Sequence, residues 1–292
     1  MLIKLFTIVK DEVDIVDQWV HYHGRLVGYE NLHIVDNIST DGTYERLEEL
    51  RKKHGCHLWR LEDYTKKGDY MSILIRQFCQ DTVIAYPLDI DEFIVHYDKQ
   101  TLTVSCDSKQ ILDYFQNTVV PIILSNGHYC FKTNYIMSKV INQEGDPAFS
   151  GYANAVLEST HGYYSDYSNK AKTFFSARYI LQTPGFKIDH GNHYETNDFL
   201  MTDLVLLHYH TRSHEQMIKK ITNNCSGLGY PVNDVNLLST LPWYSAGGHH
   251  IANRIKILNG TYAITIVPPQ TDCTDANISL QPMIEHMKSF FR

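Results

Sequence analysis

The chain of 292 residues has a formal charge of −7 and a pI near 6.1, which argues against a dedicated nucleic-acid binder because phosphate backbones require clustered Lys and Arg. Its 43% of hydrophobic residues suit one large α/β domain, or one domain with an appended subdomain. Six scattered cysteines form no CxxC pair, so neither a zinc ribbon nor a disulfide scaffold is indicated and reduced thiols are expected.

The N-terminal residues do not resemble a targeting segment. The apolar stretch 2–9 is too short, and too soon interrupted by charge, for a signal peptide. No later run approaches the roughly 18 to 20 apolar residues of a membrane span. We therefore expect a soluble, cytoplasmic protein without a transmembrane segment, which would reach a membrane face only through a partner.

The first hundred residues alternate between two hydrophobic patterns. Runs rich in β-branched residues predict strands, and apolar residues at helical spacing predict helices, with Gly28 and Gly55 as helix stops. Strands are predicted at residues 2–9, 31–37, 56–62 and 83–97, and helices at 13–28, 43–55 and 70–81. This alternation predicts a Rossmann-like half with a parallel sheet and helices on its faces.

The pattern beyond residue 120 is mixed. We predict strands at residues 121–131, 171–181 and 203–210, and helices at 153–160, 213–224, 250–258 and 281–291. No low-complexity tract or internal repeat marks a linker. Residues from about 221 onward are expected to pack on the core as a cap.

Polar and acidic side chains follow three of the predicted strands, where parallel sheets bind their ligands. No G-x-G-x-x-G follows the first strand, so a classical dinucleotide site is not expected. Asp36 ends the second strand and suits a ribose or a base, whereas Asp41 suits the cap of the next helix. Asp89 and Asp91 alternate at the end of an apolar run, so both side chains face one side. Two converging carboxylates favour a divalent cation, Mg²⁺ or Mn²⁺, that would bridge a diphosphate.

Four motifs, taken together, resemble the GT-A-fold glycosyltransferases of the family 2 and family 92 type. They are "KDE" at 10–12, "DNISTDGT" at 36–43, "DIDEF" at 89–93 and "LHYHTRS" at 207–213. The resemblance implies a GT-A α/β fold with a mostly parallel central sheet flanked by helices and a C-terminal helical extension. It divides the chain into a glycosyltransferase domain at 1–220, with a nucleotide-binding half at 1–97 and an acceptor half at 98–220, and an extension at 221–292.

The same resemblance implies transfer of a sugar from a nucleotide-diphosphate donor, most simply a UDP-sugar, to the hydroxyl of a glycan or another acceptor. Thr7, Glu12, Asp36 and Asn37 would then contact the nucleotide. Asp89 would be shared between metal and ribose, Asp91 would bind the metal, and His208 would complete the metal shell with His210 as the alternative. Glu92 would anchor the strand end to neighbouring backbone.

A leaving diphosphate needs positive charge beside it, and an inverting displacement needs a general base. Lys220 and Arg76 are candidates for the charge, with Arg212 and Lys219 as further possibilities. Glu158 resembles the helix-borne acid of the family, and Asp189, beside His190, is its rival for the base.

Three other readings remain open. A nucleotidyltransferase acting on a sugar phosphate would use the same half-fold. The 16 histidines, in "HYH", "HGNH" and "GGHH", would suit a zinc-dependent hydrolase, although that leaves the strand-end acids without a shared purpose. The 20 tyrosines would suit a carbohydrate-binding module.

Overall fold

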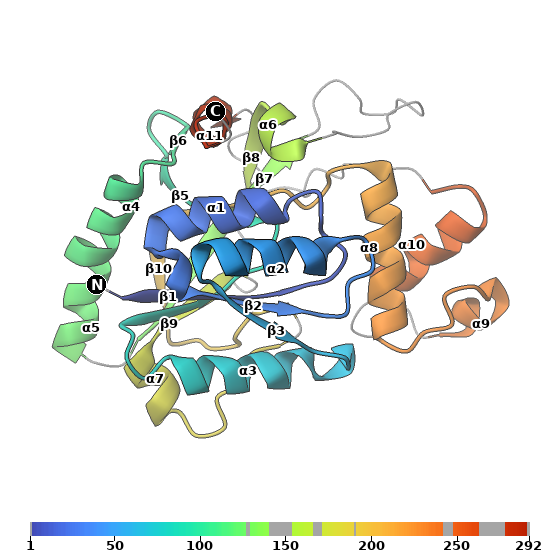
Figure 1. The fold of residues 1–292 in the computed structure, drawn as a ribbon, viewed down its shortest axis with the longest axis horizontal. Coiled ribbons are helices and arrows are strands. Elements are labelled where there is room, and N and C mark those ends of the chain that lie inside the picture. The colour runs from blue at the N-terminus through green and yellow to red at the C-terminus, as the bar shows by residue number, and fades with distance from the viewer. Residues whose placement is uncertain are drawn as a thin grey trace.

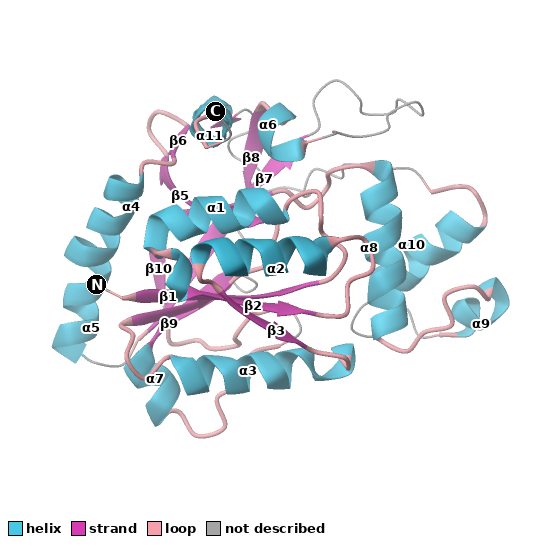
Figure 2. Ribbon diagram, in the orientation of Figure 1, coloured by secondary structure: helices cyan, strands magenta, loops and turns pink. Residues whose placement is uncertain are grey.

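The computed structural model describes residues 2–126, 129–139, 154–165, 171–189, 191–241, 248–262 and 278–290, and these form a mixed α/β protein (Figures 1 and 2). Its strands are β1 (Ile3–Val9), β2 (Leu32–Asp36), β3 (His57–Arg60), β4 (Ile84–Pro87), β5 (Glu92–Asp98), β6 (Thr103–Ser105), β7 (Cys130–Lys139), β8 (His161–Ser165), β9 (Lys172–Ser176), β10 (Leu200–His208) and β11 (Ile278–Ser279). Its α-helices are α1 (Val16–Val27), α2 (Thr43–His54), α3 (Lys67–Phe78), α4 (Ser108–Tyr114), α5 (Val120–Asn126), α6 (Ala155–Glu158), α7 (Ala177–Gln182), α8 (His214–Gly227), α9 (Val235–Thr240), α10 (Gly248–Leu258) and α11 (Gln281–Lys288).

The N-terminal half has the parallel arrangement that the alternating pattern predicts. Its strands lie side by side in the order β3–β2–β1–β4, all parallel. Every residue of β1 and β2 is buried, because α1 and α2 cover one face of the sheet and α3 the other (Figure 1). Gly28 and Gly55 follow α1 and α2 with φ of 93° and 84°, as their role as helix stops requires. The register sets Val9 beside Asp36, so the carboxyl ends of these strands share one edge.

The rest of the sheet is mixed, which corrects the expectation of a mostly parallel one. β9 runs antiparallel to β4 and to β7, and β10 runs parallel to β7 but antiparallel to β5. Because β10 pairs with both β7 and β5, the strands β7, β8, β11, β6, β5 and β10 close into a ring. The short connection at 99–102 makes β5 and β6 a hairpin, and no crossover helix separates them to enforce parallel pairing.

The acidic run at 83–97, expected as one strand, forms two strands in different parts of the sheet. β4 pairs with β1, and β5 pairs with β10. Residues 88–91 make the connection, and they include Asp89 and Asp91. The two acids therefore lie in a turn between strands, at the end of the parallel half.

The run at 121–126, expected as part of a strand, belongs to a continuous helical stretch from α4 to α5. A π-helical turn at Phe115–Val119 joins the two helices, and Pro121 is the second residue of α5. Proline lacks the N–H that an α-helix uses, and the wider turn relieves the clash of its ring with the preceding carbonyls. β7 begins only at Cys130.

The C-terminal part is more than a helical extension. The boundary expected after residue 220 falls inside α8, and α8 packs against α10. β11 enters the sheet between β6 and β8, and α11 buries Met283, Ile284 and Met287. No helix in the described ranges has the length and apolarity needed to cross a bilayer.

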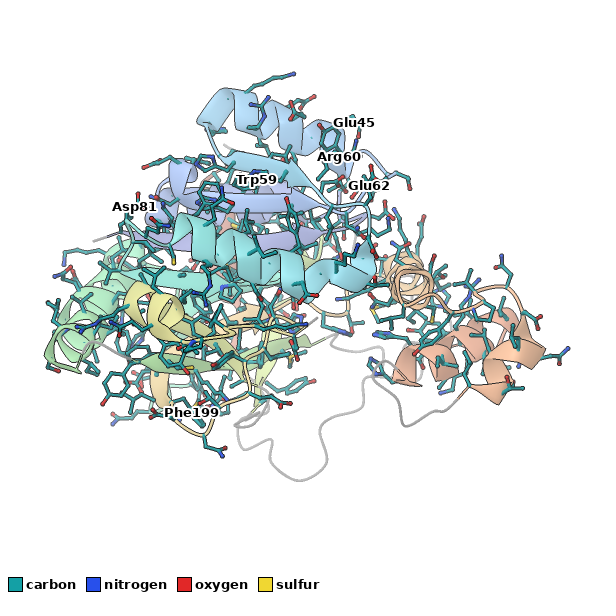
Figure 3. The ribbon with its side chains drawn as sticks, turned by 90° about the horizontal axis from the view of Figure 1, so that it is seen from below. Glu45, Trp59, Arg60, Glu62, Asp81 and Phe199 are labelled. Atoms are coloured by element: carbon teal, nitrogen blue, oxygen red, sulfur yellow. The ribbon has the colours of Figure 1, made fainter. Side chains whose placement is uncertain are left out.

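A buried histidine in β2, His33, should make the free energy of unfolding decrease at acidic pH. His33 is 1% exposed and stacks on Phe6 and His57 with centroid distances of 4.7 Å. It also stacks on Trp59, which Figure 3 labels. Neither ring nitrogen of His33 has a hydrogen-bond partner among the described residues. Burial lowers the pKa of His33 to about 3 from the ordinary 6.5.

A histidine whose pKa is depressed on folding stabilises the protein above its unfolded pKa, and this contribution is lost as the pH falls toward the folded value. Between pH 7 and pH 5 the loss from His33 should be about 2 kcal/mol. The free energy of unfolding, measured by urea denaturation, should therefore differ less between pH 7 and pH 5 in His33→Phe than in the wild type, by about 2 kcal/mol. His57→Phe is the control, since that ring is exposed in the same stack. An unchanged pH dependence in His33→Phe would contradict the prediction.

Candidate functional site

A cleft of about 450 Å³ lies beyond the carboxyl ends of β1 and β4. Figure 1 shows α8 and α10 standing beyond this edge of the parallel strands. The far wall of the cleft comes from Asn223 of α8, from Leu228 directly after that helix, and from His249 and His250 of α10. Residues 89–91 of the β4–β5 turn form its inner wall. This is the edge at which parallel α/β sheets bind ligands.

Asp91 lies at the centre of the ionic contacts on the inner wall, and its side chain is 3% exposed. Its Oδ2 is 2.8 Å from Lys220 Nζ and 3.5 Å from Arg212 Nη1, and its Oδ1 is 3.3 Å from His208 Nε2. Burial alone would raise the pKa of Asp91, but the charges of Lys220, His208 and Arg212 hold it well below its ordinary value. Asp91 is therefore an anion held by the cations Lys220 and Arg212, with His208 beside it.

Asp89 has a separate set of partners. Lys172 Nζ lies 2.8 Å from its Oδ2, Lys67 Nζ lies 3.7 Å from its Oδ1, and Asn192 Nδ2 donates to Oδ1 at 2.9 Å. Burial opposes ionisation, yet Lys172 and Lys67 lower the pKa of Asp89 below its ordinary value. Both oxygens are thus occupied by groups of the protein itself.

A lysine from β9 anchors this side of the site. Lys172 is 0% exposed, and its Nζ also lies 3.2 Å from Glu92 Oε1 and donates to the carbonyl of Gly191 at 2.8 Å. The other oxygen of Glu92 accepts the backbone N–H of Asp89 at 2.8 Å, the anchoring role expected of Glu92 from the sequence. Burial raises the pKa of Glu92 to about 7, although Lys172 opposes the rise. A buried cation with two carboxylates fixes the turn that carries Asp89.

Arg212 ties the end of β1 to the segment between β10 and α8. This guanidinium is 2% exposed and contacts Glu12, while its Nε donates to Asp14 Oδ2 at 2.7 Å. Gln216 Nε2 donates to Glu12 at 2.7 Å. Burial raises the pKa of Glu12 to about 7 against the attraction of Arg212. The two segments that frame Asp91 are therefore held together by charge-assisted bonds.

Asp91 and His208 are the pair best placed to hold a divalent cation. Two neighbouring ligands of an octahedral ion lie about 3 Å apart, close to the 3.3 Å between Asp91 Oδ1 and His208 Nε2. A carboxylate and an imidazole suit Mn²⁺. Asp89 is the more exposed of the two acids, at 30%, and its oxygens face Lys172 and Asn192. The described residues contain no group of three or more His, Cys, Asp or Glu arranged to hold a metal, so substrate or water would have to supply the remaining ligands.

No family model matches the chain, and no curated protein matches it. Among solved structures, S. aureus TarS 1–349 aligns with a TM-score of 0.43 and 11% identity, covering 89% of this chain and 73% of that one. Glucosyl-3-phosphoglycerate synthase from Mycobacterium tuberculosis, in complex with Mn²⁺ and UDP, gives 0.39 and 13%, with 79% and 81% covered. A cytidylyltransferase from Leptospira borgpetersenii gives 0.35 and 9%, with 89% and 94% covered. Similarity at this level assigns no function to a residue.

Of the residues that the sequence predicts to contact the nucleotide, Glu12, Asp89 and Lys220 line the cleft. Asp91 and His208, which it predicts to bind the metal, line the cleft as well. His210 lines it as well, with its ring perpendicular to that of His208 at 5.4 Å. The sequence motifs at 10–12, 89–93 and 207–213 thus meet at one place.

Asp36 and Asn37 lie one strand away from the cleft lining. Asp36 is fully buried at the end of β2, accepts the N–H of Ser39 at 3.2 Å and pairs with Arg60 at 3.3 Å. Figure 3 labels Arg60, whose guanidinium also lies 4.0 Å from the ring centre of Tyr44. Asn37 Nδ2 donates to the carbonyl of Leu61 at 2.6 Å.

Thr7 and Arg76 lie farther inside the fold. Thr7 is fully buried in β1 opposite Ile34, and its hydroxyl has no hydrogen-bond partner in the described part of the chain. Arg76 Nη2 donates to the carbonyl of Thr183 at 2.9 Å, which ties α3 to the end of α7. Neither residue lines the cleft.

The two candidates for a general base differ in position. Glu158 is exposed at the end of α6, and its Oε1 accepts the N–H of Asn154, the N-cap residue of that helix, at 3.1 Å. Asp189 is exposed, and its Oδ1 accepts the N–H groups of Gly191 and His193 at 2.8 and 2.7 Å. Gly191 and His193 line the cleft, so Asp189 shapes its rim and Glu158 lies outside it. His190 falls outside the described residues.

Sequence reasoning missed Lys172, Lys67 and Asn192, the partners of Asp89. Lys172 lies in "AKTFFS", where a charge precedes an apolar stretch. A buried charge requires a counter-ion, so this lysine carried the same signal as the acids at 89–92. Asn192 and Lys67 lie in polar segments, where no comparable signal distinguishes them.

Proposed function

We propose that this chain is a GT-A-like glycosyltransferase that moves a sugar from a nucleotide-diphosphate donor, with a UDP-sugar as the expected class, to an acceptor hydroxyl of a glycan. The observation that carries the proposal is Asp91, held among Lys220, Arg212 and His208 at the carboxyl edge of a parallel βαβ half. The adjoining cleft of about 450 Å³ has the volume of a small-molecule site. The four motifs that resemble glycosyltransferases support the same reading.

In the proposed reaction the acceptor oxygen forms a bond to the anomeric carbon of the donor sugar while the bond from that carbon to the diphosphate oxygen breaks. Negative charge develops on the departing phosphate. Lys220 lies on the cleft wall, where its ammonium would stabilise that charge. Asp91 and His208 would hold Mn²⁺ or Mg²⁺, which when bound supplies further positive charge to the diphosphate.

A carboxylate must accept the proton of the acceptor hydroxyl, and Asp189 and Glu158 are the proposed candidates. Asp189 is favoured by position, because the turn that it caps contributes Gly191 and His193 to the cleft. Attack on the face opposite the diphosphate would invert the anomeric configuration. Asp36 is proposed to reach the nucleoside from the end of β2, on the same edge of the sheet as Asp89.

The test is incubation with a panel of nucleotide sugars and acceptor glycans, with Mn²⁺ or with EDTA, and measurement of the free nucleoside diphosphate. We expect release from at least one UDP-sugar, and suppression of it by EDTA. Neither release nor a thermal shift with any donor would contradict the proposal. Pyrophosphate release from a nucleoside triphosphate and a sugar phosphate would instead assign a nucleotidyltransferase.

A further inference from the structure

Two consecutive lysines of α8 reach different acids. Lys220 lines the cleft and places Nζ 2.8 Å from Asp91 Oδ2. Lys219 places Nζ 2.9 Å from Asp41 Oδ2, and it is not part of the cleft lining. Successive residues of an α-helix point about 100° apart, which accounts for the difference. The chain thus supplies a lysine of the site and a matched lysine beside it.

The two cations on Asp91 Oδ2 are held to different degrees. Arg212 is 2% exposed and is fixed by Glu12 and Asp14 as well. Lys220 is 21% exposed, and in the described part of the chain its hydrogen bond is to Asp91 alone. A lysine ammonium is a compact charge on a flexible stem, so Lys220 is the cation free to move.

The ammonium of Lys220 contacts the carboxylate that the proposed metal would need. Asp91 Oδ1 faces His208, and its Oδ2 lies 2.8 Å from Lys220. A divalent ion bound to Asp91 would repel an ammonium only a few ångströms away. Lys220 and a bound metal therefore each weaken the interaction of the other with Asp91.

We propose that Lys220 competes with a divalent cation for Asp91, and that the diphosphate of the donor ends the competition by drawing Lys220 onto its phosphate oxygens. This inference rests on the proposed function and adds to it a coupling between nucleotide binding and metal binding. Without nucleotide, Lys220 neutralises Asp91 and weakens metal binding. With nucleotide, Lys220 moves to the phosphate and Asp91 becomes available to the metal. Each ligand therefore strengthens the binding of the other, as linkage requires.

The competition is tested by titrating the protein with Mn²⁺ in the absence of nucleotide, with free Mn²⁺ measured by electron paramagnetic resonance. We expect Lys220→Met to bind Mn²⁺ about tenfold more tightly than the wild type, within the range of ordinary coupling energies. Lys220→Arg keeps the charge and should bind Mn²⁺ as the wild type does. Lys219→Met, on the same helix, should also match the wild type.

The second half is tested by calorimetric titration of UDP with and without Mn²⁺. In the wild type Mn²⁺ should raise the affinity for UDP, and Lys220→Met should bind UDP about tenfold more weakly and show less enhancement by Mn²⁺. Thermal unfolding of each variant verifies that it is folded, and Lys220→Gln replaces Lys220→Met if the latter is not.

The outcomes separate the two proposals. Equal or weaker Mn²⁺ binding by Lys220→Met, or no Mn²⁺ binding by any variant, would overturn the competition. Tighter Mn²⁺ binding by Lys220→Met without UDP binding by any protein would support the competition, while it would overturn the role of the diphosphate and the glycosyltransferase assignment.

Discussion

Replacing Asp91 by asparagine is expected to reduce nucleoside diphosphate release by roughly a thousandfold, because the substitution removes the carboxylate that contacts Lys220, Arg212 and His208 together. The remaining positive charge would repel a divalent cation, so Mn²⁺ binding should be lost as well. Both effects are measured on the same preparation, the first by release from the best donor and the second by Mn²⁺ titration. Activity within tenfold of the wild type would contradict the assignment.

Asp91→Asn should also lower the free energy of unfolding. Removing one partner of a buried ion pair typically costs about 3 to 5 kcal/mol, because the other charge stays buried without compensation. Donor binding must therefore be measured well below the unfolding midpoint. Asp81→Asn is the matched control, since it removes a carboxylate from an ion pair with Lys4 at an exposed position (Figure 3). It should leave activity and the unfolding midpoint close to those of the wild type.

Replacing Lys172 by methionine is expected to destabilise the protein by about 3 to 5 kcal/mol in urea denaturation at pH 7. The side chain is 0% exposed and faces both Asp89 and Glu92, so its removal leaves two carboxylates close together in the interior. Donor use should fall too, because Asp89 loses the contact that orients it. A loss of less than about 1 kcal/mol would show that this cation does not hold the turn.

A second substitution isolates the electrostatic part of that loss. Glu92→Gln in the Lys172→Met background removes one of the two carboxylates and should recover part of the lost free energy, which a double-mutant cycle measures. Lys132→Met is the control for burial alone. Lys132 is 2% exposed on β7, and its ammonium lies 4.2 Å from the ring centre of Phe199 rather than beside these acids. Its replacement should cost about 0.5 to 2 kcal/mol.

The part of the fold that the sequence predicts well is the part whose contacts are close along the chain. Strands β1 to β3 and helices α1 to α3 alternate within the first 78 residues, and all except β3 bury residues that their own hydrophobic pattern reveals. The split of residues 83–97 into β4 and β5 depends on pairing with β10, more than a hundred residues later. No local pattern carries that information. The prediction of a strand at 121–126 was wrong for another reason, because a short apolar run does not distinguish a strand from a helix.

The site shows a similar division. The acids at 89–92 were found because charges in an apolar run require partners, and the structure supplies those partners. Which cation meets which acid could not be predicted. Arg212 was considered only for a diphosphate, yet it contacts Asp91 and also Glu12 and Asp14, which lie 200 and 198 positions away in the sequence. The pairing follows from the position of β10 between β5 and β7, which is a property of the whole fold.

The position of β11 has a consequence for biosynthesis. β11 fills the gap between β6 and β8, with Ser279 opposite Thr103 and Ile278 opposite Gly162. Until the ribosome has released residues 278–290, β6 and β8 each present an unpaired edge, and such edges associate with other chains. The nascent protein therefore passes through a long interval in which its ring of strands is open. Expression at low temperature, or with a chaperone that shields strand edges, should therefore raise the soluble yield.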